Sequence, residues 1–162
     1  METVAIDAIE PVPEGDSEIN RRPLTEPLGT TDLAANYYVL EPGESFVGGL
    51  HAHMDQEEVF VVFEGTMTFE TTTDPAGEHD LVVVGPREAI RFGRGEYQEG
   101  RNDGDERAVV LALGAPRDST AGRVPRTCPD CGDSEYQETV MIDGTLRVQC
   151  PSCEVIHDSG LH

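Results

Sequence analysis

The chain has 162 residues, a length that fits one ordinary domain or one small domain with an appendage. It carries 32 acidic residues against 11 basic ones, all of them arginine, for a formal net charge of −21. Polyanions such as DNA bind through clusters of lysine and arginine, and the only adjacent basic pair is Arg21-Arg22, so the composition weighs against a nucleic-acid partner. The N-terminal segment has no apolar run long enough for a secretory signal or a membrane span, which predicts a cytoplasmic protein without membrane contact.

Regular patterning begins near Asn36. Before it, Val4–Ile6 is expected to form a short edge strand, and Glu10–Pro27, rich in proline and charge, a loop. After it, short apolar segments alternate with glycine, proline, asparagine and aspartate breakers. The expected strands are Tyr37–Leu40, Glu44–Leu50, Glu58–Phe63, Thr66–Thr71, Leu81–Val84, Ala89–Phe92 and Ala108–Leu113. Many short strands at this spacing predict an all-β sandwich or barrel.

The chain is expected to divide into two parts. Residues 1–115 form a β-barrel whose core spans residues 36–113, and residues 116–127, with their glycines and prolines, form a linker. Residues 128–162 form a small segment that contains all four cysteines.

Two histidines and a glutamate are the first candidate site. On a strand His51 and His53 point to the same face, because side chains alternate with a period of two. Glu58 opens the next expected strand, and if the two strands pair, its carboxylate reaches the same point. Two imidazoles and one carboxylate leave open positions on a divalent metal and suit Fe, Mn, Ni or Zn. Gly65 then permits a tight turn.

The pattern His-x-His-x4-Glu-x6-Gly, preceded by Pro42-Gly43, resembles the first signature of the cupin superfamily. This resemblance implies a double-stranded β-helix, or jelly-roll barrel, that holds one metal ion inside it. Glu57 is the alternative carboxylate, since the family tolerates either spacing. We prefer Glu58 because its distance from Gly65 fits the motif.

The second cupin signature, Pro-x-Gly-x2-His-x3-Asn, is matched only in part. Gly95 and Asn102 agree, whereas Gly93 replaces the proline and Gln98, in the strand after Gly95, replaces the fourth metal ligand. An amide oxygen is a poorer ligand than imidazole for late transition metals. Gln98 is therefore expected to be a weak fourth ligand, or to bond to a metal-bound water.

Apolar side chains are expected to line a cavity beside the metal. Phe60 and Val62 share parity with Glu58, and Phe92 and Tyr97 are assigned to the same lining, with Tyr97 as a candidate acid. A polar metal site beside an apolar wall is typical of small-molecule binding.

The four cysteines are the second candidate site. Cys128-x-x-Cys131 and Cys150-x-x-Cys153 flank two apolar runs joined by Asp143-Gly144, a strong hairpin signal. The hairpin brings the pairs together, and four thiolates bind Zn²⁺ tetrahedrally. The segment resembles the zinc-ribbon family, which implies a structural zinc. Over residues 123–162 acidic residues outnumber Arg123, Arg126 and Arg147, so a protein contact or stabilisation is favoured over nucleic-acid binding. The remaining histidines, His79, His157 and His162, are assigned to the surface or the tail.

The fold does not fix the function, and three interpretations remain open. In the first, the barrel is a metal-dependent enzyme of the oxygenase or isomerase/lyase type that acts on an unidentified small molecule. In the second, it binds a small ligand as a sensor, and the ribbon contacts a protein partner or a second copy of the chain. In the third, it binds metal without catalysis. Schiff-base chemistry is excluded, because the chain has no lysine.

The acidic residues are spread along the whole chain, a composition that resembles proteins of salt-accumulating haloarchaea. At molar salt the Debye length is about 3 Å, so self-repulsion is screened. The acidity is therefore interpreted as an adaptation to the environment and not as a functional site.

Overall fold

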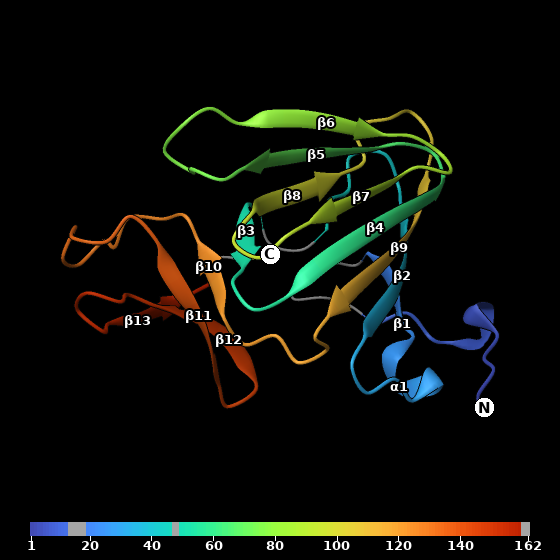
Figure 1. The fold of residues 1–162 in the computed structure, drawn as a ribbon, viewed down its shortest axis with the longest axis horizontal. Helices are drawn as coiled ribbons and strands as arrows, with labels where there is room; N and C mark the ends of the chain where they lie inside the picture. The colour runs from blue at the N-terminus through green and yellow to red at the C-terminus, as the bar shows by residue number, and fades with distance from the viewer. Residues whose placement is uncertain (13–18, 47–48, 160–162) are drawn as a thin grey trace.

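The computed structural model describes residues 1–12, 19–46 and 49–159 (Figure 1). Its strands are β1 (Asn20–Pro23), β2 (Ala34–Leu40), β3 (His51–His53), β4 (Glu57–Glu64), β5 (Met67–Thr72), β6 (Asp80–Val84), β7 (Ala89–Phe92), β8 (Tyr97–Arg101), β9 (Ala108–Ala115), β10 (Gly122–Val124), β11 (Gln137–Ile142), β12 (Thr145–Gln149) and β13 (Ile156–Asp158). A 3-10 turn, η1 (Ile6–Ala8), and a one-turn helix, α1 (Thr25–Leu28), precede β2. Within the described residues no helix combines the length and the apolar character needed to cross a bilayer.

The strands form two antiparallel sheets. One has the order β1-β2-β9-β4-β7 and the other β13-β12-β11-β10-β3-β8-β5-β6. Strands β2, β4, β7 and β9 of the first sheet face β3, β8 and β5 of the second and enclose the jelly-roll barrel (Figure 1). The predicted all-β jelly-roll is confirmed.

Aromatic side chains pack against one another inside the barrel. The rings of Phe46 and Phe60 have centroids 5.1 Å apart, those of Phe60 and Phe69 5.1 Å, and those of Phe69 and Phe92 5.4 Å. Val62 is fully buried in the same cluster. Large rings at such separations stabilise the core through both buried area and edge contacts.

Gly65 makes the turn from β4 to β5. Its φ is +68°, and a Cβ built there would lie 2.4 Å from the carbonyl oxygen of Arg107. Only glycine tolerates both the left-handed backbone and this close approach. The predicted role of Gly65 is confirmed.

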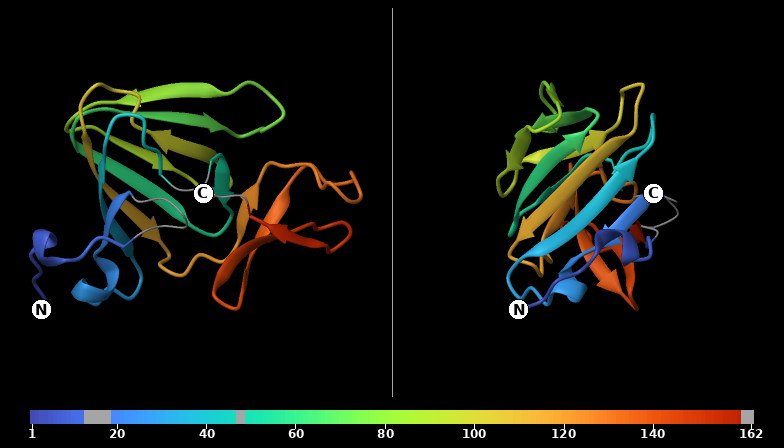
Figure 2. Two further views of the ribbon diagram at one scale, coloured as in Figure 1. Left: turned by 180° about the vertical axis from the view of Figure 1, so that it is seen from behind. Right: turned by 90° about the vertical axis from the view of Figure 1, so that its right-hand side faces the viewer.

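The C-terminal hairpins extend the barrel sheet to one side. Asp143 and Gly144 have φ of 48° and 76° and join β11 to β12, as the hairpin signal predicts. Strand β10 pairs with β11 and also with β3, where Gly122 lies opposite His53. One continuous sheet thus runs from the barrel into the cysteine-bearing segment (Figure 2).

Several local expectations differ from the structure. The 3-10 turn η1 covers Ile6–Ala8, and no strand forms at Val4–Ile6, while the expected loop Glu10–Pro27 contains β1, paired with β2. The expected strand Glu44–Leu50 is reduced, in the residues described, to an isolated bridge from Ser45 to Arg101, and its residues 47–48 lie outside that part of the chain. The expected linker contains β10. Each difference reflects long-range pairing, which local composition does not encode.

The net charge leads to a prediction about salt. Surface pairs such as Arg91–Glu57, 3.3 Å apart, and Arg107–Glu64, 3.1 Å apart, are exposed and add little stability. Repulsion among the remaining carboxylates opposes compaction, and salt screens it. We expect the thermal unfolding midpoint to rise steeply between low and molar KCl. A flat response in a calorimetric salt series would show that the acidity is no adaptation to salt.

Candidate metal centre

Two histidines and one glutamate converge inside the barrel. His51 and His53 lie on one face of β3, and Glu58 lies on β4. Strand β3 pairs with β8 and β10, not with β4, so the histidines and the glutamate come from opposite sheets and meet across the interior. The expectation that the two strands pair is wrong, but the same three side chains converge. Their ligand atoms lie within 4.8 Å of one another.

Hydrogen bonds orient both imidazoles. Nδ1 of His51 lies 2.9 Å from the carbonyl oxygen of Gly49, which can only accept, so Nδ1 carries the proton and Nε2 is the unprotonated nitrogen. Nδ1 of His53 lies 3.0 Å from Oγ of Ser119, and that hydroxyl donates to Oδ1 of Asp55 at 2.7 Å. Each histidine therefore presents an unprotonated Nε2 toward Glu58.

Burial keeps His53 neutral. It lowers the pKa of His53 below its ordinary value, although the nearby Asp55 carboxylate acts in the opposite direction. The pKa of Asp55 is itself lowered by the backbone N–H of Thr120 and, against the effect of burial, by the hydroxyl of Ser119. Asp55 is thus ionised and His53 is neutral at neutral pH, which is the state that metal binding requires.

The donor geometry fits a metal ion. Nε2 of His53 and Oε2 of Glu58 are 3.7 Å apart. Two donors each about 2.1 Å from one ion are separated by roughly 3 to 4 Å, so a single ion can join them without a large movement. Glu57 points outward and pairs with Arg91, which leaves Glu58 as the carboxylate of the site.

Gln98 completes the cluster. It lies opposite His51 in the β3–β8 pair, and its Nε2 is 3.3 Å from Nε2 of His51 and 3.1 Å from Oε2 of Glu58. Its Oε1 is buried and has no hydrogen-bond partner among the described residues. A half-turn of the amide exchanges the two atoms and directs Oε1 at the point that the histidines and Glu58 share. In that orientation the amide oxygen is placed to ligate a cation.

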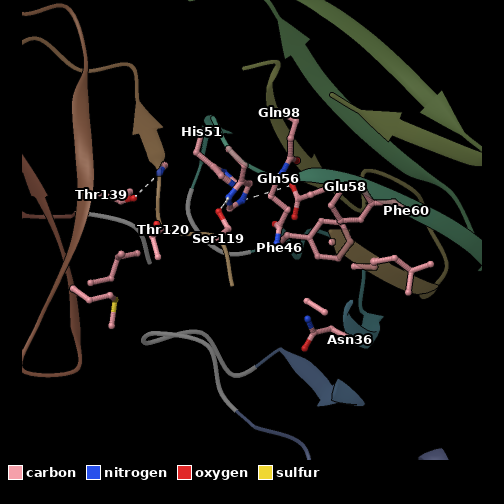
Figure 3. Close-up of a pocket in the computed structure, with 18 of the residues that line it drawn as sticks. Asn36, Phe46, His51, Gln56, Glu58, Phe60, Gln98, Ser119, Thr120 and Thr139 are labelled. Atoms are coloured by element: carbon pink, nitrogen blue, oxygen red, sulfur yellow. Dashed lines mark hydrogen bonds and ion pairs between the residues drawn. The ribbon is translucent and has the colours of Figure 1, made fainter. Parts of the chain in front are cut away.

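A cavity of about 470 Å³ opens from these side chains (Figure 3). Phe60 lines it, as predicted, together with Phe46. Val62 and Phe92 do not line it, and both are buried in the hydrophobic core. Tyr97 is adjacent to Gln98 on β8 and so faces the opposite side of the sheet, where it lines a different cavity. Tyr97 is therefore not placed to act as an acid at this site.

The four cysteines form a second cluster. Sγ of Cys128 lies 3.7 Å from Sγ of Cys153, and Sγ of Cys131 lies 3.7 Å from Sγ of Cys150. These separations are far beyond a disulfide bond, and they match the roughly 3.8 Å edge of a tetrahedron of sulfurs about 2.3 Å from zinc. Backbone N–H groups of Cys131 and Asp130 lower the pKa of the Cys128 thiol, against the effect of burial. The pKa of Cys150 is also lowered, to about 7, by the backbone N–H groups of Cys153 and Ser152 against the effect of burial, whereas the pKa values of Cys131 and Cys153 are raised. Cys128 and Cys150 therefore lose their protons more readily than the other two cysteines.

The structure shows the positions and the partners of two further histidines. His157, assigned to the tail, lies at the cysteine cluster: its Nε2 is 3.0 Å from Oδ2 of Asp130 and 3.9 Å from Sγ of Cys128. His79 pairs with Glu70 on the surface, and this contact raises the pKa of His79. The remaining one, His162, lies outside the described residues.

Ser119 and Asp55 support the site and were not predicted. Asp55 also accepts a hydrogen bond at 2.9 Å from the backbone of Thr120, which fixes the expected linker against β3. The sequence carries no signal for Ser119. Asp55 lies two residues after His53 and so has the same strand parity, which is a weak signal that it faces the site.

Comparisons with known proteins agree with this architecture. A family model described as a cupin domain matches residues 36–114. Among solved structures, a sugar phosphate isomerase of the cupin superfamily from Silicibacter pomeroyi is 18% identical, with a TM-score of 0.62 over 96% of this chain and 92% of that chain. An oxalate oxidase in complex with glycolate is 16% identical, with a TM-score of 0.57 over 72% of this chain and 60% of that one.

A protein from Bacillus halodurans is 22% identical, with a TM-score of 0.50 over 54% of this chain and 65% of that chain, so the match spans less than two thirds of its length. No curated protein sequence matches the chain. At these identities the structural matches establish the fold alone. The chain therefore carries a cupin domain over residues 36–114, followed by a four-cysteine cluster consistent with a zinc-binding motif.

Proposed function

We propose that the barrel is a divalent-metal-dependent enzyme of the oxygenase or isomerase/lyase type that acts on a small molecule. The observation that carries this proposal is the position of His51, His53 and Glu58 at the inner end of the cavity. Three protein ligands leave coordination positions for water and substrate on Fe, Mn, Ni or Zn. Bound there, the metal supplies Lewis-acid or redox chemistry.

The chain's own residues have distinct roles in this proposal. The imidazoles of His51 and His53 and the Glu58 carboxylate hold the ion, and Ser119 fixes the tautomer of His53. The aromatic wall of Phe46 and Phe60 excludes water from one side of the site. The sugar phosphate isomerase and the glycolate-bound oxalate oxidase support the proposal as proteins of the same fold with small oxygenated ligands or substrates.

Turnover of small oxygenated molecules tests the proposal. Protein loaded separately with Fe²⁺ and Mn²⁺ is incubated with hydroxy acids, oxo acids and sugars, and O₂ uptake and solvent-deuterium incorporation into the compounds are followed. We expect one of the two signals in the wild type and its loss in His53→Ala. Saturable binding of a compound without turnover under either metal would contradict the enzyme proposal.

A sensor is the second candidate, and the continuous sheet favours it. Strand β3, which carries both histidines, is hydrogen-bonded to β10, and β10 to β11 of the C-terminal hairpin. Ligand binding at the metal can therefore shift the hairpin, and the exposed Met141 of β11 and Ile156 of β13 suit contact with a protein partner or a second copy of the chain.

We also propose that the cysteine cluster binds one zinc ion with a structural role. All four thiolates occupy the coordination positions, so no water is activated there. The short hairpins around the cluster bury few apolar side chains, and the metal supplies the stability that they lack.

Gln98 is proposed as a weak fourth ligand of the barrel metal. Replacing it with histidine (Gln98→His) is expected to tighten Ni²⁺ or Zn²⁺ binding by roughly ten- to a hundred-fold, because imidazole is the better donor. Isothermal titration of the metal measures the change, and Glu99→His, whose side chain faces the other side of the sheet, is the matched control.

If Gln98 contacts the substrate instead, Gln98→His will impair ligand binding while metal affinity stays constant. No change in either affinity would contradict both roles of Gln98.

A further inference from the structure

The C-terminal hairpin forms part of the cavity that holds the metal centre. Thr139, Val140 and Met141 of β11 and Leu146 of β12 line the same cavity as His51 and Glu58. Figure 3 shows Thr139 on one side of the cavity and Phe46 and Phe60 on the other, with the candidate ligands between them. The cysteine-bearing segment is therefore a wall of the site as well as an appendage of the barrel.

The position of this wall is fixed at the base of the hairpin. Oγ1 of Thr139 accepts a hydrogen bond of 3.0 Å from the backbone N–H of Gly122, and Gly122 lies opposite His53 in the β10–β3 pair. Thr139 also pairs with Val148, and β12 runs on from there into Cys150 at the same end, away from the Asp143–Gly144 turn. The distance from the wall to the metal ligands is thus set by strand pairing and by the cysteine cluster.

The wall is apolar and accessible. The exposed fraction of Met141 is 65% and that of Leu146 is 37%, although both are large hydrophobic residues. Ala112 and Leu113 of β9 also line the cavity. Exposed hydrophobic side chains that face a cavity are suited to binding the apolar part of a ligand.

The cavity has no cationic group for a phosphate. The chain has no lysine, and none of its arginines lines the cavity. Among the described lining residues, apart from the two imidazoles, only Glu58 is ionisable near neutral pH. Protein sites for a phosphate dianion use arginine, lysine or the N-terminus of a helix, and the lining offers none of them. A divalent ion with one carboxylate leaves a single positive charge, which suits a monoanionic chelating group.

From these observations we propose that the substrate is a molecule without phosphate, with a chelating oxygen group at one end and an apolar chain at the other, and that Met141 and Leu146 determine specificity for the apolar end. This proposal rests on the proposed metal-dependent function. If the proposal is correct, this cavity does not bind a sugar phosphate as its substrate.

Three acids with the same 2-hydroxycarboxylate group test the proposal: glycolate, 2-hydroxyhexanoate and 3-phosphoglycerate. Their dissociation constants are measured by isothermal titration with the full-length protein loaded with Mn²⁺, at one salt concentration. The added four-carbon chain, in a partly enclosed apolar cavity, is expected to tighten 2-hydroxyhexanoate about ten- to a hundred-fold relative to glycolate. We expect 3-phosphoglycerate to bind no more tightly than glycolate.

The double variant Met141→Ser/Leu146→Ser is expected to lose most of this preference and to keep its affinity for glycolate. Ile142→Ser is the matched control, because Ile142 is also exposed on β11 but does not line the cavity. Circular dichroism and zinc content establish that the variants are folded.

Tighter binding of 3-phosphoglycerate than of glycolate would overturn the substrate class, and an unchanged preference in the double variant would overturn the role of the hairpin. Failure of all three acids to bind the Mn²⁺-loaded protein would contradict the proposed function itself. The two proposals can therefore fail separately.

Discussion

Replacing Cys128 and Cys131 by serine is expected to release one zinc ion per chain and to unfold β11 to β13 while the barrel stays folded. Apolar burial in this segment is small: Val148 is fully buried, whereas Met141 and Ile156 are exposed. Zinc binding by four cysteines contributes on the order of 10 kcal/mol to the folding of such small domains. The small apolar burial in this segment does not replace that contribution.

Elemental analysis under reducing conditions and amide hydrogen exchange measure these effects. Exchange should rise to the unfolded rate in residues 137–158 and stay protected in β2, β4 and β9. Ser152→Ala, between the second pair of cysteines, should keep the zinc. An unchanged zinc count or a disulfide in the wild type would contradict the assignment, and loss of protection throughout the barrel would contradict separate folding of the two parts.

The variants His51→Ala and Glu58→Ala are expected to remove the barrel metal and to leave the zinc of the cysteine cluster in place. Each removes one of three protein ligands, and Gln98 cannot compensate because its amide is a weak donor. Ser119→Ala is expected to have a smaller effect, a loss of roughly ten-fold in metal affinity, because His53 loses only the acceptor of its Nδ1 proton.

Glu57→Gln is the matched control for Glu58→Ala, since Glu57 is an exposed carboxylate one residue away. It should retain the metal. Metal content per chain after dialysis distinguishes these variants, and full retention in both His51→Ala and Glu58→Ala would contradict the site.

Local patterns predicted the candidate metal ligands because these residues follow the period of a strand. The two-residue period of a strand is sufficient to place His51 and His53 on one face, and the spacing to Gly65 selected Glu58 over Glu57. The strand pairing behind this convergence was predicted incorrectly, because β3 and β4 belong to different sheets. The same period would have excluded Tyr97, since adjacent residues on β8 cannot face the same cavity as Gln98.

The rest of the site depends on contacts between distant segments. Ser119 reaches His53 from a stretch that has no apolar alternation, and nothing in its local sequence marks it. The local sequence around Met141 and Leu146 predicts only an ordinary hairpin. The pairing of β10 with β3 brings these two residues to the cavity. Val62 and Phe92 have the parity of lining residues, but both are buried in the hydrophobic core and do not line the cavity.

In the proposed metal centre, Nε2 of His51 and Nε2 of His53 bind one divalent ion that keeps open positions. Pulsed electron paramagnetic resonance of the Mn²⁺-loaded protein tests this arrangement, because it detects ligand nitrogens and exchangeable water on the same ion. The predicted spectrum shows coupling to two imidazole nitrogens, reduced to one in His51→Ala with whatever metal remains bound, together with deuterium coupling from bound D₂O. A Mn²⁺ signal without nitrogen coupling in the wild type would contradict the claim.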